Sequence, residues 1–389
     1  MPASPPWDAI VIGRGPAASL AALRLSAEGL RVAQFIGGVE RHRRPAEILS
    51  PRSLAKLQRL GLHDAAGLGS PCAGVLQAWH SPEVDYTDFA FTQALAGRAV
   101  DRRDLQSNLL RVAGQSGVNQ IAARANVVRS HGTRPERVAW TGPSGERHEM
   151  ESPCILIATG RVPTEQASPA RSGTANLVAM TMPWVARQHT TALVLEACES
   201  GWFYSPPVVG EASDLVFITD AAVLPRRSPA RAGWLESMVA RAPLLSSLGG
   251  RVDVYRCTGF SARVGAVDDP VFAGGAMLGD AANALDPLSG SGIGQALDAA
   301  WFATDDVLKQ GRVGDAYRAW FRAARAEQSA IGLRRNAEAA TRFPASDFWR
   351  RRMIAARLQH QAFGENAGQA DSQARTQSCN EPYQSADSN

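Results

Sequence analysis

The feature that most constrains the fold lies near the start of the chain, where a glycine-rich turn joins an apolar run to a helix-like segment. The run Ala9–Ile12 is typical of a buried parallel strand. Leucines at helical spacing follow the turn, and a second apolar run spans Val32–Ile36. A strand, a helix and a second strand within about 30 residues make one β-α-β unit.

The turn matches the pattern GxGxx(G/A) of dinucleotide-binding loops. Gly13 permits the tight turn, and Gly15 lets the backbone approach a pyrophosphate. Pro16 and Ala17 begin the helix, whose N-terminal amides and dipole favour phosphate, and Ala18 keeps the helix close to the strand. The sequence therefore predicts an α/β protein with a Rossmann-type nucleotide-binding core.

One part of the dinucleotide pattern is absent. An acidic residue normally ends the second strand and holds the ribose, but that position is Ile36. Glu40, four residues later, is the candidate that replaces it.

A second glycine-rich segment follows the apolar residues Ala276–Leu278. It comprises Gly279-Asp280-Ala281-Ala282, then Asp286-Pro287, then Gly290-Ser291-Gly292-Ile293-Gly294. It resembles the GD segment of FAD monooxygenases of the p-hydroxybenzoate hydroxylase superfamily. The resemblance implies that Asp280 hydrogen-bonds the ribitol of FAD and that Pro287 shapes the wall beside the flavin ring. A helix that starts at the glycine-rich turn would stabilise negative charge on the reduced flavin.

Two further segments resemble the same superfamily. Val100–Leu105 is similar to its DRxxL helix start, which implies that Arg102 reaches the FAD. Ile157–Arg161 is similar to its ATGR strand end, where Gly160 allows close backbone approach. The Asp-Gly pair of the nicotinamide-using members is missing near that strand. The electron donor is therefore left open between a flavin reductase and NAD(P)H.

Other motifs point to a branch of this superfamily. Pro45–Pro51 resembles the GExLPP segment of halogenase-like members, which implies that Glu47 lies near the flavin. Gly201–Pro207 resembles their GWxWxIP motif, with Trp202 and Tyr204 as an aromatic wall. Halogenases also need a lysine that guides hypohalous acid. Only Lys56 and Lys309 are available and neither position fits, so the sequence disfavours halogenation.

The same motifs, together with the run Phe348-Trp349-Arg350-Arg351-Arg352, resemble the flavoproteins that mature tryptophylquinone enzymes such as quinohemoprotein amine dehydrogenase. The resemblance implies hydroxylation, through a flavin C4a-hydroperoxide formed from O2, of a tryptophan side chain in a partner polypeptide such as the dehydrogenase small subunit. Indole is nucleophilic, so a strong base is not obligatory. Glu47 and His80 are the best candidates for one, although a structural role for His80 is the commoner case.

Two alternatives of different class stay open. One is a flavin-dependent oxidoreductase or halogenase that acts on a small aromatic molecule. The other is a non-catalytic flavoprotein scaffold that recognises a partner polypeptide. Bound FAD together with O2-dependent mass gain on a substrate separates an enzyme from a scaffold.

The sequence also predicts a domain organisation. Residues 1–75, 97–165 and 271–312 would form a discontinuous FAD-binding domain of the glutathione-reductase type. Residues 76–96 and 166–270 would form an inserted β-sheet substrate domain. A helical region, 313–363, and a disordered tail, 364–389, would follow, because the tail has little apolar surface to bury.

Composition bounds the remaining possibilities. Hydrophobic content of 45% and charged content of 20% are ordinary for a soluble enzyme, and the net charge of +4 suggests no nucleic-acid partner. No stretch approaches the ~20 apolar residues that a membrane span needs. The five cysteines are scattered, with no CxxC pair and no metal-ligand spacing, which predicts a reduced, cytoplasmic protein without a metal site.

Overall fold

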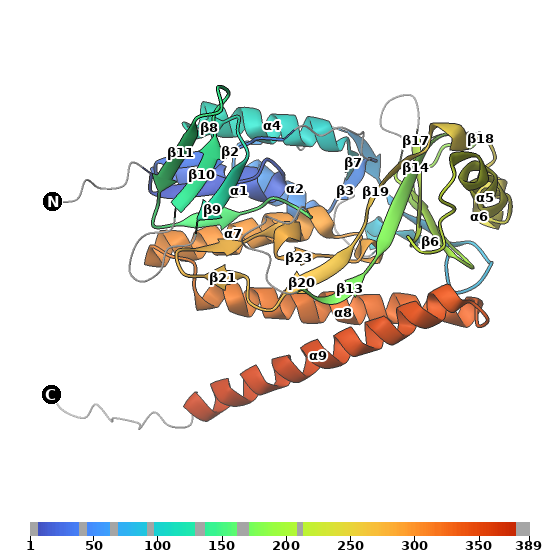
Figure 1. Ribbon diagram of the computed structural model, residues 1–389. Helices are drawn as coiled ribbons and strands as arrows, with labels where there is room; N and C mark the ends of the chain where they lie inside the picture. The colour runs from blue at the N-terminus through green and yellow to red at the C-terminus, as the bar shows by residue number, and fades with distance from the viewer. Residues whose placement is uncertain are drawn as a thin grey trace, which may run out of the picture.

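The computed structural model describes residues 7–38, 45–62, 69–91, 97–128, 137–161, 171–207 and 213–378. Figure 1 shows a nucleotide-binding half, a second half built on a large antiparallel sheet, and two long helices that run beneath both. Glu40, the predicted ribose ligand, lies outside the described residues. Among the helices in these ranges, none is long and apolar enough to cross a membrane.

A six-stranded sheet in the order β21-β22-β12-β1-β2-β8 forms the first half. Its strands are β1 (Ala9–Ile12), β2 (Val32–Phe35), β8 (Asn119–Ile121), β12 (Ile155–Ile157), β21 (Val271–Phe272) and β22 (Gly275–Met277). All neighbours pair in parallel except β21 with β22. The predicted β-α-β unit is confirmed, and β12 lies between the N-terminal strand β1 and the late strand β22.

The two faces of this sheet are covered differently, because alternate residues of a strand point to opposite sides. Ala9 and Val11 pack with helices α1 (Pro16–Ala27), α4 (Arg102–Gln115) and α7 (Gly292–Gln310). Ile10 and Ile12 pack against an antiparallel sheet of β9 (Ala125–Val128), β10 (Arg137–Thr141) and β11 (Arg147–Glu151). The α/β architecture predicted from the sequence is confirmed.

Helix α2 (Pro51–Arg59) begins with a side-chain cap and a proline. The Ser50 side chain accepts a hydrogen bond from the Ser53 amide at 3.2 Å, and Pro51 occupies the first helical position, where it has no amide to satisfy. A short sheet, β3 (Glu47–Leu49), β7 (Gly97–Val100) and β4 (Ser70–Cys72), flanks this helix. It places Glu47 opposite Val100, just before α4.

The second half is an eight-stranded sheet in the order β18-β14-β17-β16-β15-β5-β6, with β19 also paired to β14. Its strands are β5 (Gly74–Ala78), β6 (Asp85–Asp88), β14 (Leu177–Val185), β15 (Ala192–Cys198), β16 (Gly201–Ser205), β17 (Ser213–Asp220), β18 (Arg251–Val252) and β19 (Thr258–Ser261). Only β5 and β15 pair in parallel. Helices α5 (Ser228–Ala240) and α6 (Pro243–Leu248) cover one face.

Short elements connect the halves. A three-stranded sheet, β13 (Arg171–Ala175), β20 (Val264–Val267) and β23 (Asn283–Ala284), lies between them, as Figure 1 shows. Four 3-10 turns complete the described elements: η1 (Phe89–Phe91), η2 (Val254–Arg256), η3 (Gly279–Ala281) and η4 (Pro287–Ser289).

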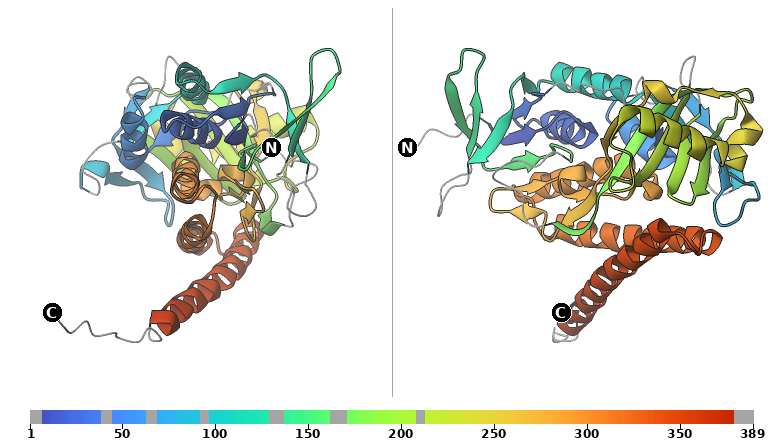
Figure 2. Two further views of the ribbon diagram at one scale, coloured as in Figure 1. Left: turned by 90° about the vertical axis from the view of Figure 1, so that its left-hand side faces the viewer. Right: turned by 45° about the vertical axis from the view of Figure 1, so that its right-hand side comes forward.

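Two long helices end the chain. Helix α8 (Asp315–Arg342) runs along the body, and α9 (Asp347–Ser378) crosses it and then projects away, as Figures 1 and 2 show. The structure therefore continues as helix through residues 364–378, where the sequence suggested a disordered tail. The three alanines and three glutamines of that segment favour a helix. Residues 379–389 lie outside the described residues.

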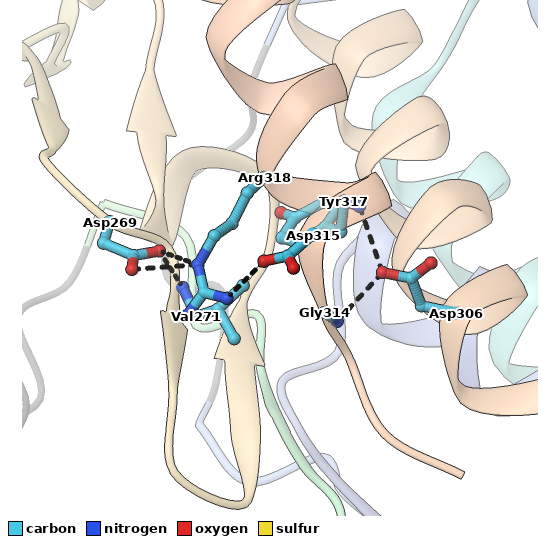
Figure 3. Close-up of polar contacts among 7 residues, drawn as sticks. All are labelled: Asp269, Val271, Asp306, Gly314, Asp315, Tyr317 and Arg318. Atoms are coloured by element: carbon cyan, nitrogen blue, oxygen red, sulfur yellow. Dashed lines mark hydrogen bonds and ion pairs between the residues drawn. The ribbon is translucent and has the colours of Figure 1, made fainter. Parts of the chain in front are cut away.

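Asp306 attaches α8 to the nucleotide-binding half (Figure 3). This buried carboxylate of α7 accepts hydrogen bonds from the Gly314 and Tyr317 amides at 2.9 and 3.0 Å. It thus caps the first turn of α8 from a neighbouring helix, which satisfies amides that have no partner within α8. The Tyr317 hydroxyl donates to the Met277 carbonyl at 2.8 Å and ties the same turn to β22.

Replacing this cap should destabilise the protein. We expect Asp306→Ala to cost about 1–2 kcal/mol of unfolding free energy, because two amides lose their acceptor. Asp315→Ala is the matched control in the same turn, since the Asp315 side chain is 98% exposed and pairs only with the partly exposed Arg318 in Figure 3. Thermal melting checks this; equal melting temperatures for the two variants would contradict the capping role.

Candidate cofactor and active site

The first glycine-rich turn lies against the end of β12. Gly13 has φ 140°, and a Cβ added to it would lie 2.2 Å from the Ala158 carbonyl oxygen, so only glycine fits there. Gly15 differs: it caps α1 at φ −79°, and an added Cβ would meet nothing within 4 Å. The backbone at Gly15 therefore faces open space at the N-terminus of α1, as a pyrophosphate-binding turn requires.

The two glycine-rich signatures meet in space. Gly279 begins the 3-10 turn η3 with φ 55°, and a Cβ added to it would lie 3.2 Å from the Ala17 Cβ and 3.4 Å from the Ala296 Cβ. Ala17 and Ala18 are themselves buried at the start of α1. Small side chains at these positions bring the Gly13 turn, η3 and the start of α7 to the same end of the parallel sheet. Ligands of such sheets bind at that end.

Arg161 links the end of β12 to the second signature. Its Nε lies 3.1 Å from the Asp280 carboxylate, and its Nη atoms donate to the Arg263 and Leu285 carbonyls at 3.0 and 3.2 Å. The structure thus joins Asp280 to Arg161, the residue that follows Gly160. Gly160 has φ 72°, and an added Cβ would meet nothing within 4 Å. The sequence analysis missed the part played by Arg161, although the segment Ile157–Arg161 contained the signal.

The turn that starts α7 is built around Asp286. Its Oδ1 accepts the Leu288 amide at 3.0 Å, and Pro287 occupies the first position of η4. Gly290 is left-handed at φ 60°, and added Cβ atoms at Gly290 and Gly292 would again meet nothing within 4 Å. The final glycine, Gly294, has a packing role, since its Cβ would lie 3.2 Å from Ser53 Oγ on α2.

Ile293, between these glycines, is buried among the apolar side chains of the first core and so anchors the first turn of α7. Gly290 and Gly292, ahead of it, are exposed. The start of α7 is therefore anchored on one side and open to solvent on the other, as a site for the negatively charged edge of a flavin would be.

A polar cluster, which we define as Glu47, Arg102, Arg161 and Tyr204, lies where the two halves meet. Arg102 Nη1 and Glu47 Oε1 form an ion pair at 2.6 Å, between the first residue of α4 and the first residue of β3. Burial raises the pKa of Tyr204 well above its usual range; Glu47 and Asp214 add to the rise, whereas Arg102 and Arg161 oppose it. Tyr204 is therefore a neutral phenol at physiological pH, within electrostatic range of the predicted cofactor residues.

Trp202 lies deeper than the sequence suggested. Residues 202 and 204 share one face of β16, and Phe203 points to the other, against α5 and α6. Trp202 is only 1% exposed, and its ring centroid lies 6.1 Å from Trp349 and 6.3 Å from Phe348 on α9. It packs as part of an aromatic core, so Tyr204 is the member of the predicted aromatic wall that reaches the polar cluster.

His80 is not brought to this cluster. It follows β5, two strands away from β16 in the sheet, and its side chain is exposed. The adjacent Trp79 is buried and donates from Nε1 to the Arg335 carbonyl at 2.9 Å. His80 lies in the turn after β5 with its side chain exposed. This position disfavours His80 as a base at the flavin.

Both lysines form ion pairs away from the polar cluster. Lys56 Nζ pairs with Asp298 of α7, and burial together with Arg52 and Arg59 lowers the pKa of Lys56 to about 8. Lys309 pairs with Asp305 at 2.7 Å near the end of the same helix. Each lysine is thus held by a carboxylate of α7.

Taken with the two joined glycine signatures, this arrangement defines the fold of the FAD-dependent halogenases and monooxygenases. The myxobacterial chondrochloren halogenase CndH matches with a TM-score of 0.76 at 20% identity, over 89% of this chain and 85% of that chain. The peptidyl tryptophan dihydroxylase QhpG, essential for tryptophylquinone cofactor biogenesis, matches at 0.68 and 21%, over 89% and 78%. PqsL, a probable FAD-dependent monooxygenase from Pseudomonas aeruginosa, matches at 0.67 and 18%, over 90% and 99%.

No protein-family model matches the sequence, and no curated protein is significantly similar to it. At the identities of the solved structures, the similarity establishes the fold. The predicted fold class is confirmed; CndH is an FAD-dependent halogenase, and PqsL is a probable FAD-dependent monooxygenase. The glycines at 15, 160, 290 and 292, each open on the side where a Cβ would stand, fit such a cofactor in this chain.

The contrast between Gly13 and Gly15 gives a clean test of the cofactor turn. We expect Gly15→Val to fold, because its backbone suits any residue and its Cβ meets open space, yet to bind FAD roughly tenfold more weakly or worse. Gly13→Val should instead lower the melting temperature of the cofactor-free protein, because its side chain would collide with Ala158. Flavin absorbance per chain and thermal melting separate the two; full FAD occupancy in Gly15→Val would overturn the assignment.

Proposed function

We propose that this chain is an FAD-dependent monooxygenase that oxidises an aromatic ring. The observation that carries the proposal is the close approach of Gly279 to Ala17. It brings two glycine-rich nucleotide motifs, which are far apart in the sequence, to the same end of the parallel sheet. Gly13, Gly15 and the start of α1 would hold the pyrophosphate. Asp280, oriented by Arg161, would hold the ribitol.

When bound and reduced, FAD would supply the two electrons that activate O2; one oxygen atom of O2 would enter the ring and the other would leave as water. The residues of this chain do the rest. The open N-terminus of α7, at Gly290 and Gly292, would stabilise the negative edge of the reduced cofactor. Tyr204 stays protonated and can donate a hydrogen bond toward the substrate side. The ring of Tyr204 and the apolar surface of Pro287 would exclude water.

We propose further that the substrate is a tryptophan side chain of a partner polypeptide, such as the small subunit of a quinohemoprotein amine dehydrogenase. The support is the resemblance of residues 201–207 and 348–352 to flavoproteins of that kind, and the similarity to QhpG in fold. The side chains of Arg350 and Arg351 are 61% and 56% exposed, so both can form ion pairs with carboxylates of a partner. Indole needs no deprotonation before attack, which agrees with the exposed position of His80.

Two accompanying proposals concern the setting of the reaction. Electrons would come from a flavin reductase or from NAD(P)H. The chain lacks the Asp-Gly pair of nicotinamide-using relatives, so the sequence does not decide between the two donors. A reducing compartment, the cytoplasm, suits the free thiols of Cys72, Cys154 and Cys198, each of which is buried.

The substrate proposal is tested by mass. The flavin-loaded protein is reduced with dithionite and mixed with O2 and either the small-subunit polypeptide or free tryptophan. We expect a gain of one or two oxygen atoms on the polypeptide alone, and no gain when its target tryptophan is replaced by phenylalanine. Turnover of free tryptophan or of a simple phenol, with the polypeptide unchanged, would refute the polypeptide substrate and favour the small-molecule alternative.

Halide incorporation tests the branch of the superfamily. We expect no chlorinated or brominated product from any indole, because Lys56 and Lys309 are both held in ion pairs on α7. Mass spectrometry of reactions run with added chloride or bromide checks this. A halogenated product that persists in Lys56→Met would point to another group, and one that disappears would restore Lys56 as a halogenation lysine.

A further inference from the structure

Arg352 joins three segments that are distant in sequence. Its Nη2 forms an ion pair with Asp286 Oδ2, and its Nε donates to Asn336 Oδ1 of α8 at 3.1 Å. Its guanidinium carbon lies 5.5 Å from the centroid of the Trp202 ring. Arg352 is only 8% exposed, so α9 delivers a buried cation to the turn that precedes α7.

Helix geometry explains why this arginine, alone of the three in its run, turns inward. Phe348, Trp349, Arg352 and Ala356 form one buried stripe, at the three- and four-residue spacing of a helix face. Arg350 and Arg351 fall on the outer side, where Arg350 pairs with Asp347 at 2.6 Å and Arg351 lies 4.0 Å from Asp220. The two outer arginines therefore serve as internal controls for the inner one.

The ion pair between Arg352 and Asp286 constrains the turn that leads into α7. One carboxylate oxygen of Asp286 caps the Leu288 amide, and the other binds Arg352. Asp286 is thus fixed at both oxygens, and the turn it begins leads directly through Gly290 to the first residue of α7, Gly292. A buried charge that loses its partner is strongly destabilising, so this contact strongly favours one arrangement of the turn.

We propose that Arg352 is a positioning residue, which acts through Asp286 to hold the N-terminus of α7 against the flavin. The proposal rests on the proposed function for its flavin part. Its structural part, the ordering of residues 286–292 by α9, stands independently and has its own measurement.

The first measurement is hydrogen exchange on cofactor-free protein. In Arg352→Gln, amides of residues 286–295 should exchange about tenfold faster or more than in the wild type, because one partner of a buried pair is lost. Amides of α4 should exchange at the wild-type rate. Arg350→Gln should leave both segments unchanged. Equal exchange of residues 286–295 in Arg352→Gln and Arg350→Gln overturns the proposal.

The second measurement is sulfite binding to the oxidised flavin, which reports how well the site stabilises negative charge on the ring. Arg352→Gln should bind sulfite about three- to tenfold more weakly, because the dipole of α7 is less well placed. Arg352→Lys, which keeps the charge, should recover part of the affinity. Unchanged sulfite affinity in Arg352→Gln, with the flavin still bound, overturns the link to the flavin.

A double variant distinguishes action through Asp286 from general loosening of α9. If Arg352 works through that carboxylate, Asp286→Asn and Arg352→Gln combined should weaken sulfite binding no more than the stronger single variant. Additive losses overturn this route. If Arg352→Gln fails to fold, Arg352→Lys decides by the same two measurements. Should the wild type retain no flavin, the proposed function fails, while hydrogen exchange still decides the role of Arg352.

Discussion

The close approach of the Gly13 turn to the Ala158 carbonyl is the contact on which the rest of the structure depends. With no room for a Cβ at Gly13, β1 and β12 lie directly side by side, and the turn closes over the end of the sheet. Helix α1 can then lie almost wholly buried against α7 and α4. This packing leaves the backbone at Gly15 open, so one short segment both anchors the core and offers a binding surface.

The antiparallel half depends on the alternation of side chains along β16. Phe203 enters the core beneath α5 and α6, whereas Trp202 and Tyr204 face the nucleotide half and the C-terminal helices. Shifting this strand by one residue would bury the wrong face on both sides. The same register therefore secures the sheet and places Tyr204 where the charges of Glu47 and Arg102 affect its pKa. A change in the register of β16 would therefore alter both the stability of the sheet and the position of Tyr204.

Local patterns predicted the local structure well. The first β-α-β unit and the start of α4 at Arg102 follow from residues that lie together in the sequence. The pairs Arg161–Asp280 and Arg352–Asp286 join residues whose separation in the chain leaves no local signature.

Burial was equally hard to foresee. Trp202 and His80 look alike as candidate active-site residues in sequence, but tertiary packing encloses the tryptophan and leaves the histidine exposed. Helix α9 extends to Ser378, further than the sequence suggested.

The position of β12 has a consequence for how the chain is made. This strand pairs with β1, from the first residues synthesised, and with β22, which leaves the ribosome only after the whole antiparallel half. Until β22 arrives, one edge of a short and very apolar strand is unpaired, and such edges invite association with other chains. Nascent or truncated chains that end before residue 275 would therefore be prone to aggregate, whereas chains that include α7 can close the sheet and cover it.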